Sequence, residues 1–581
     1  MSTAELDEPR EATPNRRTAL LGGLAAGAAA LASACAPEAP AESAAAGARP
    51  ARLRSAPTTA VPTKSAPTTA VPTSAVPTTV LPNTPVPPSG SSTGLPAWPA
   101  TWATPGVWHV AKRLTFGPNP AVLAQIGALG ATAWIDSQLN HLSIADPAVA
   151  DATSFYEWSR GSAAQISARG QEWRVVVDLP LSTALRAVVS ERQLFERTVG
   201  FWWDHLNVDV NNDAARNHCP SYDSDVIRAH ALGKFSDLLA AVAKSGAMLN
   251  YLDQSTSRAD RGRVPNENYA RELMELHTVG VNGGYSEADV VAVSYLFSGW
   301  TLTDKWSGTF AFNSARHALG PFASGSTTVL GWTRGSLTGQ AAGESFLNHL
   351  ARHRVTAQRL AHKLCVRFIG EHIGLNDRVV LAARDAYLAQ DTAIAPTLRT
   401  IFTSEEFARS ADAKIRRPLE LLAAGLRATC DAPFNRQTAE DTKWNFQGIL
   451  TALSAMPHHW PTPDGYPDKD AAWVSVGSMI SRWNLATYLG NGNIPGFVRD
   501  WNTLPAWVAG PAGGSTTGST VGEWLDAAAQ RLGVPLDAAG KQRMLVSVSR
   551  VASTPITANG NRWVAPKLLG QLMQQPQFQT A

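Results

Sequence analysis

The chain has 581 residues, of which 50 are basic and 47 acidic, and its formal net charge is only +3. No basic run and no stripe of aromatic residues with arginine stands out, so nucleic acid is not an expected partner. The chain is longer than one usual hydrophobic core, and two packed units are expected once non-globular parts are set aside. Its four cysteines include no C-x-x-C pair, which argues against a disulfide framework and against the common cysteine zinc sites.

The N-terminal residues have the pattern of an export signal. Arg16 and Arg17 precede an apolar run, rich in alanine and glycine, that is too short and too weakly hydrophobic to span a membrane. This pattern is typical of a twin-arginine signal peptide, which we assign to residues 1–35. Two positions depart from the usual signal: Asn15 replaces Ser or Thr, and Ala19 stands where Phe is common.

Two processing routes remain open at the end of this segment. Ala32-Ser33-Ala34 forms an A-x-A cleavage site, whereas Leu31 to Cys35 resembles a lipobox in which the leucine lies one residue too far from the cysteine. Cys35 is therefore a candidate for lipidation. The predicted location is outside the cell or in the cell envelope, with a lipid anchor in the second case.

Residues 36–99 consist largely of Ala, Pro, Ser and Thr, and the nonapeptide S-A-P-T-T-A-V-P-T occurs twice, at 55–63 and 65–73. Such a composition lacks the apolar side chains whose burial would offset the entropy of ordering the chain. We predict a disordered, semi-extended linker that holds a folded domain away from a membrane or carries it through a cell wall. A cell wall or a membrane surface is thus an expected partner of the N-terminal segment.

The remainder has the pattern of a mainly α, multi-helix globular domain with a small β-hairpin. Strands and helices do not alternate along the sequence, which argues against a doubly wound sheet. We assign residues 100–500 to this domain and 501–581 to a C-terminal helical extension. The hairpin is expected within 309–330, carrying Arg316 and His317. The helices are predicted at 120–129, 131–139, 181–206, 234–251, 266–280, 286–298, 341–350 and 356–368, followed by further helices up to Phe407 and after Pro418.

The stretch Asn266–Gly280, N-E-N-Y-A-R-E-L-M-E-L-H-T-V-G, holds the densest set of ionisable residues on any predicted helix. Asparagine and glycine are typical residues for the start and the end of a helix. Ala270, Leu273 and His277 fall on one stripe, so the imidazole is predicted to face inward with apolar neighbours. A histidine in that place is either a packed, hydrogen-bonded core residue or a group held for chemistry.

Several short motifs occur in order between roughly Trp102 and Leu489. They are R-L-T-F-G-P at Arg113, F-W-W-D-H-L-N-V at Phe201, the Asn266 stretch, S-G-W-T at Ser298, R-H-A-L-G-P with T-V-L-G between Arg316 and Gly331, H-K-L-C-V-R-F at His362, K-I-R-R-P-L-E-L at Lys414 and W-P-T-P-D-G-Y-P-D at Trp460. Together they resemble the bacterial family catalogued as domain of unknown function 1800.

The resemblance implies a largely helical, exported bacterial protein, often with a twin-arginine signal and often encoded beside a second exported family. It brings no agreed catalytic residues. The chain departs from the family pattern at two positions: Trp203 stands where members commonly have the first histidine of F-W-H-N-H-F, and Ala318 stands where they have the aspartate of R-H-D. A co-exported protein is an expected partner on the same basis.

One functional hypothesis is an exported enzyme, a metal-assisted hydrolase acting on envelope or extracellular material. Its candidates are drawn from three motifs that would have to converge, beginning with Asp204 and His205. Neutral imidazoles with a carboxylate can hold a divalent metal such as zinc, and a glutamate can serve as the base. The metal candidates are His205, His277 and His317, and the catalytic candidates are Glu267, Glu272 and Arg316.

The alternative is a non-catalytic helical scaffold or binding protein for a co-exported partner or a wall polymer. In this interpretation Glu267 with Arg271, and Arg271 with Glu275, are i, i+4 pairs on a solvated face, while the histidines donate to backbone carbonyls. The 19 tryptophans allow a groove for a flat or sugar-like ligand, although most are expected in the core. No H-E-x-x-H motif occurs to favour the enzyme.

Overall fold

The computed structural model describes residues 106–430, 434–435, 438–492, 494–497, 499, 520–556 and 563–581. The predicted signal peptide, Cys35 with its lipobox, and the predicted linker lie outside the described residues, so these assignments stay predictions. All described residues belong to one compact unit. Among the described helices, none combines the length and apolar character that crossing a membrane requires.

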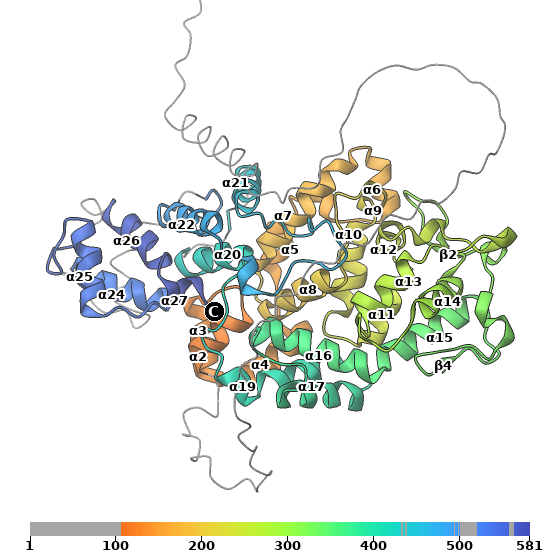
Figure 1. Ribbon diagram of the computed structural model, residues 1–581. Coiled ribbons are helices and arrows are strands. Elements are labelled where there is room, and N and C mark those ends of the chain that lie inside the picture. The colour runs from red at the N-terminus through yellow and green to blue at the C-terminus, as the bar shows by residue number, and fades with distance from the viewer. Residues whose placement is uncertain are drawn as a thin grey trace, which may run out of the picture. The chain divides into compact units, whose positions relative to one another are not determined.

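The described part of the chain is mainly α-helical, as the sequence predicts (Figure 1). The first half contains α2 (Val107–Leu114), α3 (Pro120–Leu129), α4 (Ala131–Leu139), α5 (Pro147–Thr153), α6 (Ala163–Arg169), α7 (Val175–Val189), α8 (Gln193–His205), α9 (Asp213–Arg216), α10 (Cys219–Ser221), α11 (Phe235–Lys244), α12 (Gly246–Tyr251), α13 (Asn268–Glu272) and α14 (Glu287–Phe297). Two segments are π-helices, η4 (Tyr222–Arg228) and η7 (Leu273–His277).

The second half continues with further helices, some of which pack against neighbours in the chain, such as α16 against α17, and others against distant helices, such as α22 against α26. They are α15 (Gly339–Arg352), α16 (Arg354–Phe368), α17 (Arg378–Ala389), α18 (Ile394–Phe402), α19 (Glu405–Ala408), α20 (Pro418–Thr429), α21 (Ala439–Ala452), α22 (Val476–Gly490), α24 (Val521–Leu532), α25 (Ala538–Ser547), α26 (Val564–Met573) and α27 (Pro576–Gln579). Several helix ends carry the capping residues that are typical of such positions. Ser286 and Asp289, for example, form a reciprocal capping box at the start of α14.

The predicted helix at 181–206 is wrong as a single element, because the chain breaks between α7 and α8. Ser190 has an extended backbone, and its hydroxyl donates to Asp146, which also accepts from the backbone N–H of Glu191. These bonds to a distant loop replace helical ones. The predicted helix at 234–251 likewise divides at Ser245, whose side chain caps α12 by accepting from Met248 N.

The β-structure is small, as predicted, but its strands pair differently. β1 (Trp300–Leu302) pairs antiparallel with β2 (Phe310–Phe312), and β3 (Thr328–Val329) pairs with β4 (Trp332–Thr333). The expected single hairpin within 309–330 is therefore wrong. Asp304 closes the first turn by accepting from the backbone of Trp306 and Ser307, so β2 pairs back onto the strand that follows α14.

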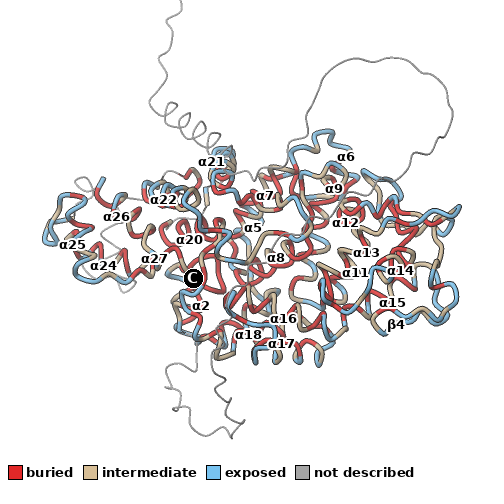
Figure 2. The backbone as a smooth tube through the Cα atoms, viewed as in Figure 1, coloured by how far each residue is buried: buried red, intermediate tan, exposed pale blue. Residues whose placement is uncertain are grey.

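The buried apolar side chains of the described residues form two groups. Figure 2 shows in red the backbone positions of the buried residues. The larger group runs from α2–α4 and α8 through α11–α18, and the smaller one joins α7, α20–α22 and α24–α26. Leu421 of α20 and Trp524 of α24 share the smaller core, and Ile415 pairs with Thr580 through a β-bridge. Residues on both sides of position 500 thus contribute to one core, while the domain boundary assigned there stays a prediction.

Candidate ligand pocket and an adjoining basic cluster

The end of α8 presents two neighbouring polar residues in different directions. Asp204 and His205 are successive helical residues, which are separated by about 100° around the axis. Asp204 lines a pocket, whereas the ring of His205 packs toward Phe201, Trp202 and His277. One short motif therefore supplies groups to two separate polar regions.

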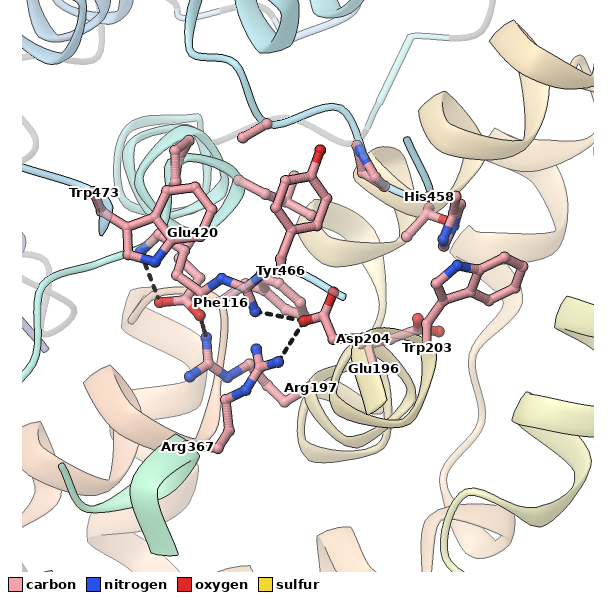
Figure 3. A pocket seen from close by; sticks show the side chains of 17 residues that line it. Phe116, Glu196, Arg197, Trp203, Asp204, Arg367, Glu420, His458, Tyr466 and Trp473 are labelled. Atoms are coloured by element: carbon pink, nitrogen blue, oxygen red, sulfur yellow. Dashed lines mark hydrogen bonds and ion pairs between the residues drawn. The ribbon is translucent and has the colours of Figure 1, made fainter. Parts of the chain in front are cut away.

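The pocket lies between α8, the start of α20 and the loop that precedes α22 (Figure 3). The space open to the centre of a water molecule is about 90 Å³, enough for several waters or a small polar ligand. The lining combines charged and aromatic side chains. It includes Phe116, Thr183, Glu196, Arg197, Trp203, Asp204, Arg367, Arg417, Glu420, His458, Tyr466 and Trp473.

Ion pairs link the charged side chains that line the pocket. Asp204 Oδ2 accepts from Arg367 Nη2 and, at 2.7 Å, from Arg417 Nη1 (Figure 3). Arg367 Nε lies 2.8 Å from Asp468 Oδ1, and Arg197 lies 2.5 Å from Glu420. Three arginines thus face three carboxylates, and a buried ion is tolerated only when it is paired in this way.

Two of the three carboxylates, Glu420 and Asp468, are held in the ionised form. Burial acts to raise the pKa of Glu420, but the charges of Arg197, Arg417 and Arg367 outweigh it and leave that pKa below the ordinary value. The pKa of Asp468 is lowered for the same reason, because Arg367 and Arg417 outweigh its burial. Glu420 and Asp468 therefore carry their negative charges at neutral pH.

The loop from Met456 to Ser475 supplies the aromatic wall. The Arg417 guanidinium lies 5.8 Å from the ring centre of Tyr466 and 5.2 Å from that of Trp473, which is cation–π geometry. Gly465 allows this loop to reach α8, because a Cβ there would stand 1.8 Å from the carbonyl oxygen of Asp204, and its φ is +71°. The D-G-Y sequence is thus required for contact as well as for the bend.

Several polar atoms of the lining have no hydrogen-bond partner among the described residues, although one of them, Arg367 Nε, lies within ion-pairing distance of Asp468. Asp204 uses only Oδ2, which leaves Oδ1 without a partner. Trp203 Nε1 and His458 Nδ1 are buried and unpartnered. Unmatched buried donors and acceptors are rare in folded proteins.

His458 is a site residue that the sequence does not reveal. It has a φ of +64°, in the left-handed region that few non-glycine residues adopt, although histidine is among those that do so more often. Its Nε2 lies 2.8 Å from Thr183 Oγ1, and its ring centre lies 3.7 Å from that of Trp203. Sequence analysis names only the neighbouring motif that begins at Trp460. The H-H dipeptide next to W-P-T-P was the available signal.

Residues 109–580 match the family described as "Protein of unknown function (DUF1800)". The chain belongs to the DUF1800 family. No curated protein and no solved structure matches it. The match covers every element of the pocket, and Trp203, one of the two departures from the family's motifs, is part of the lining.

Two of the predicted metal ligands of this DUF1800 protein come together. The ring centres of His205 and His277 are 6.5 Å apart. Both nitrogens of His205 are occupied, because Nε2 donates to the His277 carbonyl at 3.1 Å and Nδ1 accepts from Lys363 Nζ at 3.0 Å. Burial, followed by the charges of Lys363 and Arg359, lowers the pKa of His205. His205 is therefore a neutral, fully engaged residue.

The other sequence candidates of the DUF1800 chain lie elsewhere. His317 Nδ1 lies 3.0 Å from the Ser298 carbonyl, beside the first β-ribbon, and Arg316 belongs to the short helix before it. Glu267 pairs with Arg271 at 3.3 Å, and Glu272 is half-buried, with burial raising its pKa. Within the described ranges, no three His, Cys, Asp or Glu side chains lie together in an arrangement that could hold a metal ion.

Proposed function

We propose that this DUF1800 protein is an exported, cell-envelope binding protein whose pocket holds a hydroxyl-rich ligand, a sugar unit of a wall polymer. One observation carries the proposal: an aromatic wall stands beside polar atoms left without partners. A sugar offers apolar C–H faces that pack on aromatic rings and hydroxyls that both donate and accept. Tyr466 and Trp473 supply the rings in this pocket.

The ion pairs give the polar atoms their orientation. Arg367 and Arg417 fix Asp204 through Oδ2, so that Oδ1 is held ready to accept a hydroxyl hydrogen. Trp203 Nε1–H supplies a donor and His458 Nδ1 a further polar atom, and both are buried before any ligand arrives. A ligand that satisfies these atoms regains hydrogen bonds that the free pocket lacks.

Binding is supported better than metal-assisted hydrolysis. A zinc-type site needs three protein ligands with free donor atoms. His205 has no free nitrogen, and His317 is held at the β-ribbon by Ser298. The candidates His205, His277 and His317 therefore do not fit a shared ion, and no step is assigned to a divalent metal.

The proposed location rests on the N-terminal sequence. Arg16 and Arg17 belong to the export signal, and residues 36–99 would place the domain at a distance from the membrane, within reach of wall polymer. Replacing both arginines by lysine should leave the protein in the cytoplasm. Fractionation of the native host tests this, and continued export of the double variant would refute the twin-arginine assignment.

A direct test is titration of soluble wall-polysaccharide fragments into the purified chain by calorimetry. Trp473→Ala should weaken binding by about tenfold or more, because stacking and the associated burial contribute about 1 to 3 kcal/mol. Trp563→Ala is the matched control, because Trp563 is 45% exposed and does not line the pocket. Absence of saturable binding to any fragment, or equal loss in both variants, would contradict the proposed function.

A further inference from the structure

The second polar region lies where the π-helix η7 ends at His277. The carbonyls of Leu276 and Thr278 accept from Arg359 Nη1 at 2.6 and 3.2 Å, so a guanidinium of α16 caps the helix end. Gly280 makes this approach possible. A Cβ at Gly280 would lie 2.8 Å from Arg359 Cδ, and the residue has a φ of +90°.

Lys363 follows Arg359 by one turn on the same face of α16. Its Nζ donates to His205 Nδ1, which leaves two of the three ammonium hydrogens without a partner among the described residues. No carboxylate of those residues lies within ion-pairing distance of it. By contrast, Lys112, Lys234 and Lys244 each have a carboxylate partner at 2.6 to 2.8 Å. Lys363 is thus a cation without a counterion.

Two uncharged groups nearby also have unused hydrogen-bonding capacity. Both ring nitrogens of His277 and the hydroxyl of Tyr285 are buried without a partner among the described residues. Burial and then the charge of Arg359 lower the pKa of His277 to about 3, so the ring is neutral and carries one N–H. Burial, followed by the charge of Glu275, raises the pKa of the Tyr285 hydroxyl to about 12, and Arg359 acts in the opposite direction. Both groups are therefore electrostatically coupled to the same guanidinium.

We propose that Arg359, Lys363, His277 and Tyr285 form a binding site for a phosphate-type oxyanion. A tetrahedral oxyanion supplies several acceptors and a negative charge, which these donors and the unpaired ammonium lack. Lys363, Arg359 and Tyr285 are partly exposed residues, so an anion can approach the edge of the cluster from solvent, while the Tyr285 hydroxyl and the His277 ring nitrogens lie buried behind it. The site is distinct from the pocket, and its existence does not depend on the proposed sugar ligand.

The acidic residues in the neighbourhood are engaged elsewhere. Glu267 and Glu275 of the same motif pair with Arg271 on the exposed side of the helix. Asp204 is held by Arg367 and Arg417. Burial, with Arg359 next, lowers the pKa of Lys363 to about 8, while the charges of Asp468 and Asp204 act in the opposite direction without forming an ion pair with it.

The test is titration of inorganic phosphate into the purified full-length chain, with sodium chloride and sodium acetate as separate arms at equal ionic strength. Calorimetry should show one saturable site for phosphate and none for chloride. Lys363→Gln should weaken phosphate binding by about tenfold or more, since hydrogen bonds to a charged group contribute about 1.5 to 3 kcal/mol. Lys244→Gln, which removes a lysine paired with Glu344, should leave phosphate binding unchanged.

A second variant guards against misfolding of the first. Tyr285→Phe removes only a hydroxyl and should weaken phosphate binding by roughly threefold to tenfold while the melting temperature of the free protein stays nearly constant. Failure of phosphate to saturate, saturation by acetate alone, or unchanged affinity in both Lys363→Gln and Tyr285→Phe would each overturn the proposal. Loss of sugar binding in Trp473→Ala with phosphate binding retained is the expected pattern for two independent sites.

Discussion

Arg367 and Lys363 are one turn apart on α16, but the charge of Arg367 is paired with carboxylates and that of Lys363 is not. Arg367 contacts two aspartates and belongs to a balanced network of three arginines and three carboxylates. Lys363 contacts only a neutral imidazole. Balanced pairs hold a structure together without any ligand, whereas an unpaired cation favours the arrival of an anion. The same face of α16 thus carries a region of paired charges around Arg367 and a region with an unpaired cation around Lys363.

The largest effect is expected where the balanced network is broken. Asp204→Ala leaves the guanidinium groups of Arg367 and Arg417 without their shared partner, and we expect the free energy of unfolding to fall by about 3 to 5 kcal/mol. Denaturant titration measures this. The control is Asp526→Ala, whose carboxylate is 57% exposed and pairs with Lys541, and which should cost no more than about 1 kcal/mol. Equal losses would show that burial does not distinguish the two pairs.

A smaller effect on the free energy of unfolding is expected when the backbone beside Arg359, in the region of the unpaired cation, is altered. Gly280→Ala places a methyl group against Arg359 at a φ of +90°. We expect the free energy of unfolding to fall by about 1 to 3 kcal/mol, because strain at such a position is of that order. Gly284→Ala has a similar φ of +89° but meets no atom within 4 Å, so it isolates the backbone contribution. A larger loss for Gly284→Ala would contradict the contact with Arg359.

The two regions should also respond to acid differently. The folded pKa of His277 is about 3, below the ordinary 6.5, so the unfolded chain binds more protons in this interval. Stability from this residue is full above pH 6.5 and is lost as the pH falls toward 3, at up to about 1.4 kcal/mol per pH unit. His277→Gln should remove that slope.

Glu420 and Asp468 belong to the network and titrate at lower pH. Their folded pKa values lie below the ordinary 4.5 and 3.8, so their contribution is lost only as the pH falls below those values. Denaturant titrations across the pH range should therefore show an upper phase that becomes shallower in His277→Gln, by up to one proton's slope, because His109, His205 and His458 also have lowered pKa values and keep their share of it. The lower phase should remain. A His277→Gln protein with an unchanged upper phase would contradict the assignment.

The smallest effect is expected on the exposed side of the central motif. Arg271 pairs with Glu267, Glu275 and Glu287, all of which are at least 25% exposed. Glu267→Ala should change the free energy of unfolding by less than about 0.5 kcal/mol, because solvent screens such pairs. Its binding of phosphate should be unaffected. A large change in either measurement would restore Glu267 as a functional residue.

Local patterns in the sequence were sufficient for much of the fold. The helices at 120–129 and 131–139, the capped start of α14, and the i, i+4 pairs of Arg271 all follow from residues close together in the chain. The inward face of Ala270, Leu273 and His277 is confirmed, since each is at most 1% exposed. The break at Ser190 was missed because Asp146, which accepts its hydroxyl, lies 44 residues away.

The candidate sites depended more heavily on distant contacts. The pairing of Asp204 with Arg367 and Arg417 joins residues 163 and 213 positions apart, and the contact of Thr183 with His458 joins residues 275 apart. Periodicity cannot reveal the π-helix η7 either, because its extra residue is accommodated by packing. His205 and His277 were selected correctly as neighbours, yet the lysine that occupies the nitrogen of His205 was not foreseen.

The sequence by itself determined that the chain is mainly helical, that it resembles the family to which it belongs, and that the Asn266 motif turns His277 inward. Hydrophobic spacing and capping act over a few residues, and this is why they can be read without coordinates. Only the tertiary structure decided which charges are paired and which remain unpaired. Ion pairs and hydrogen bonds depend on the distances between side chains from remote helices, and packing alone sets those distances.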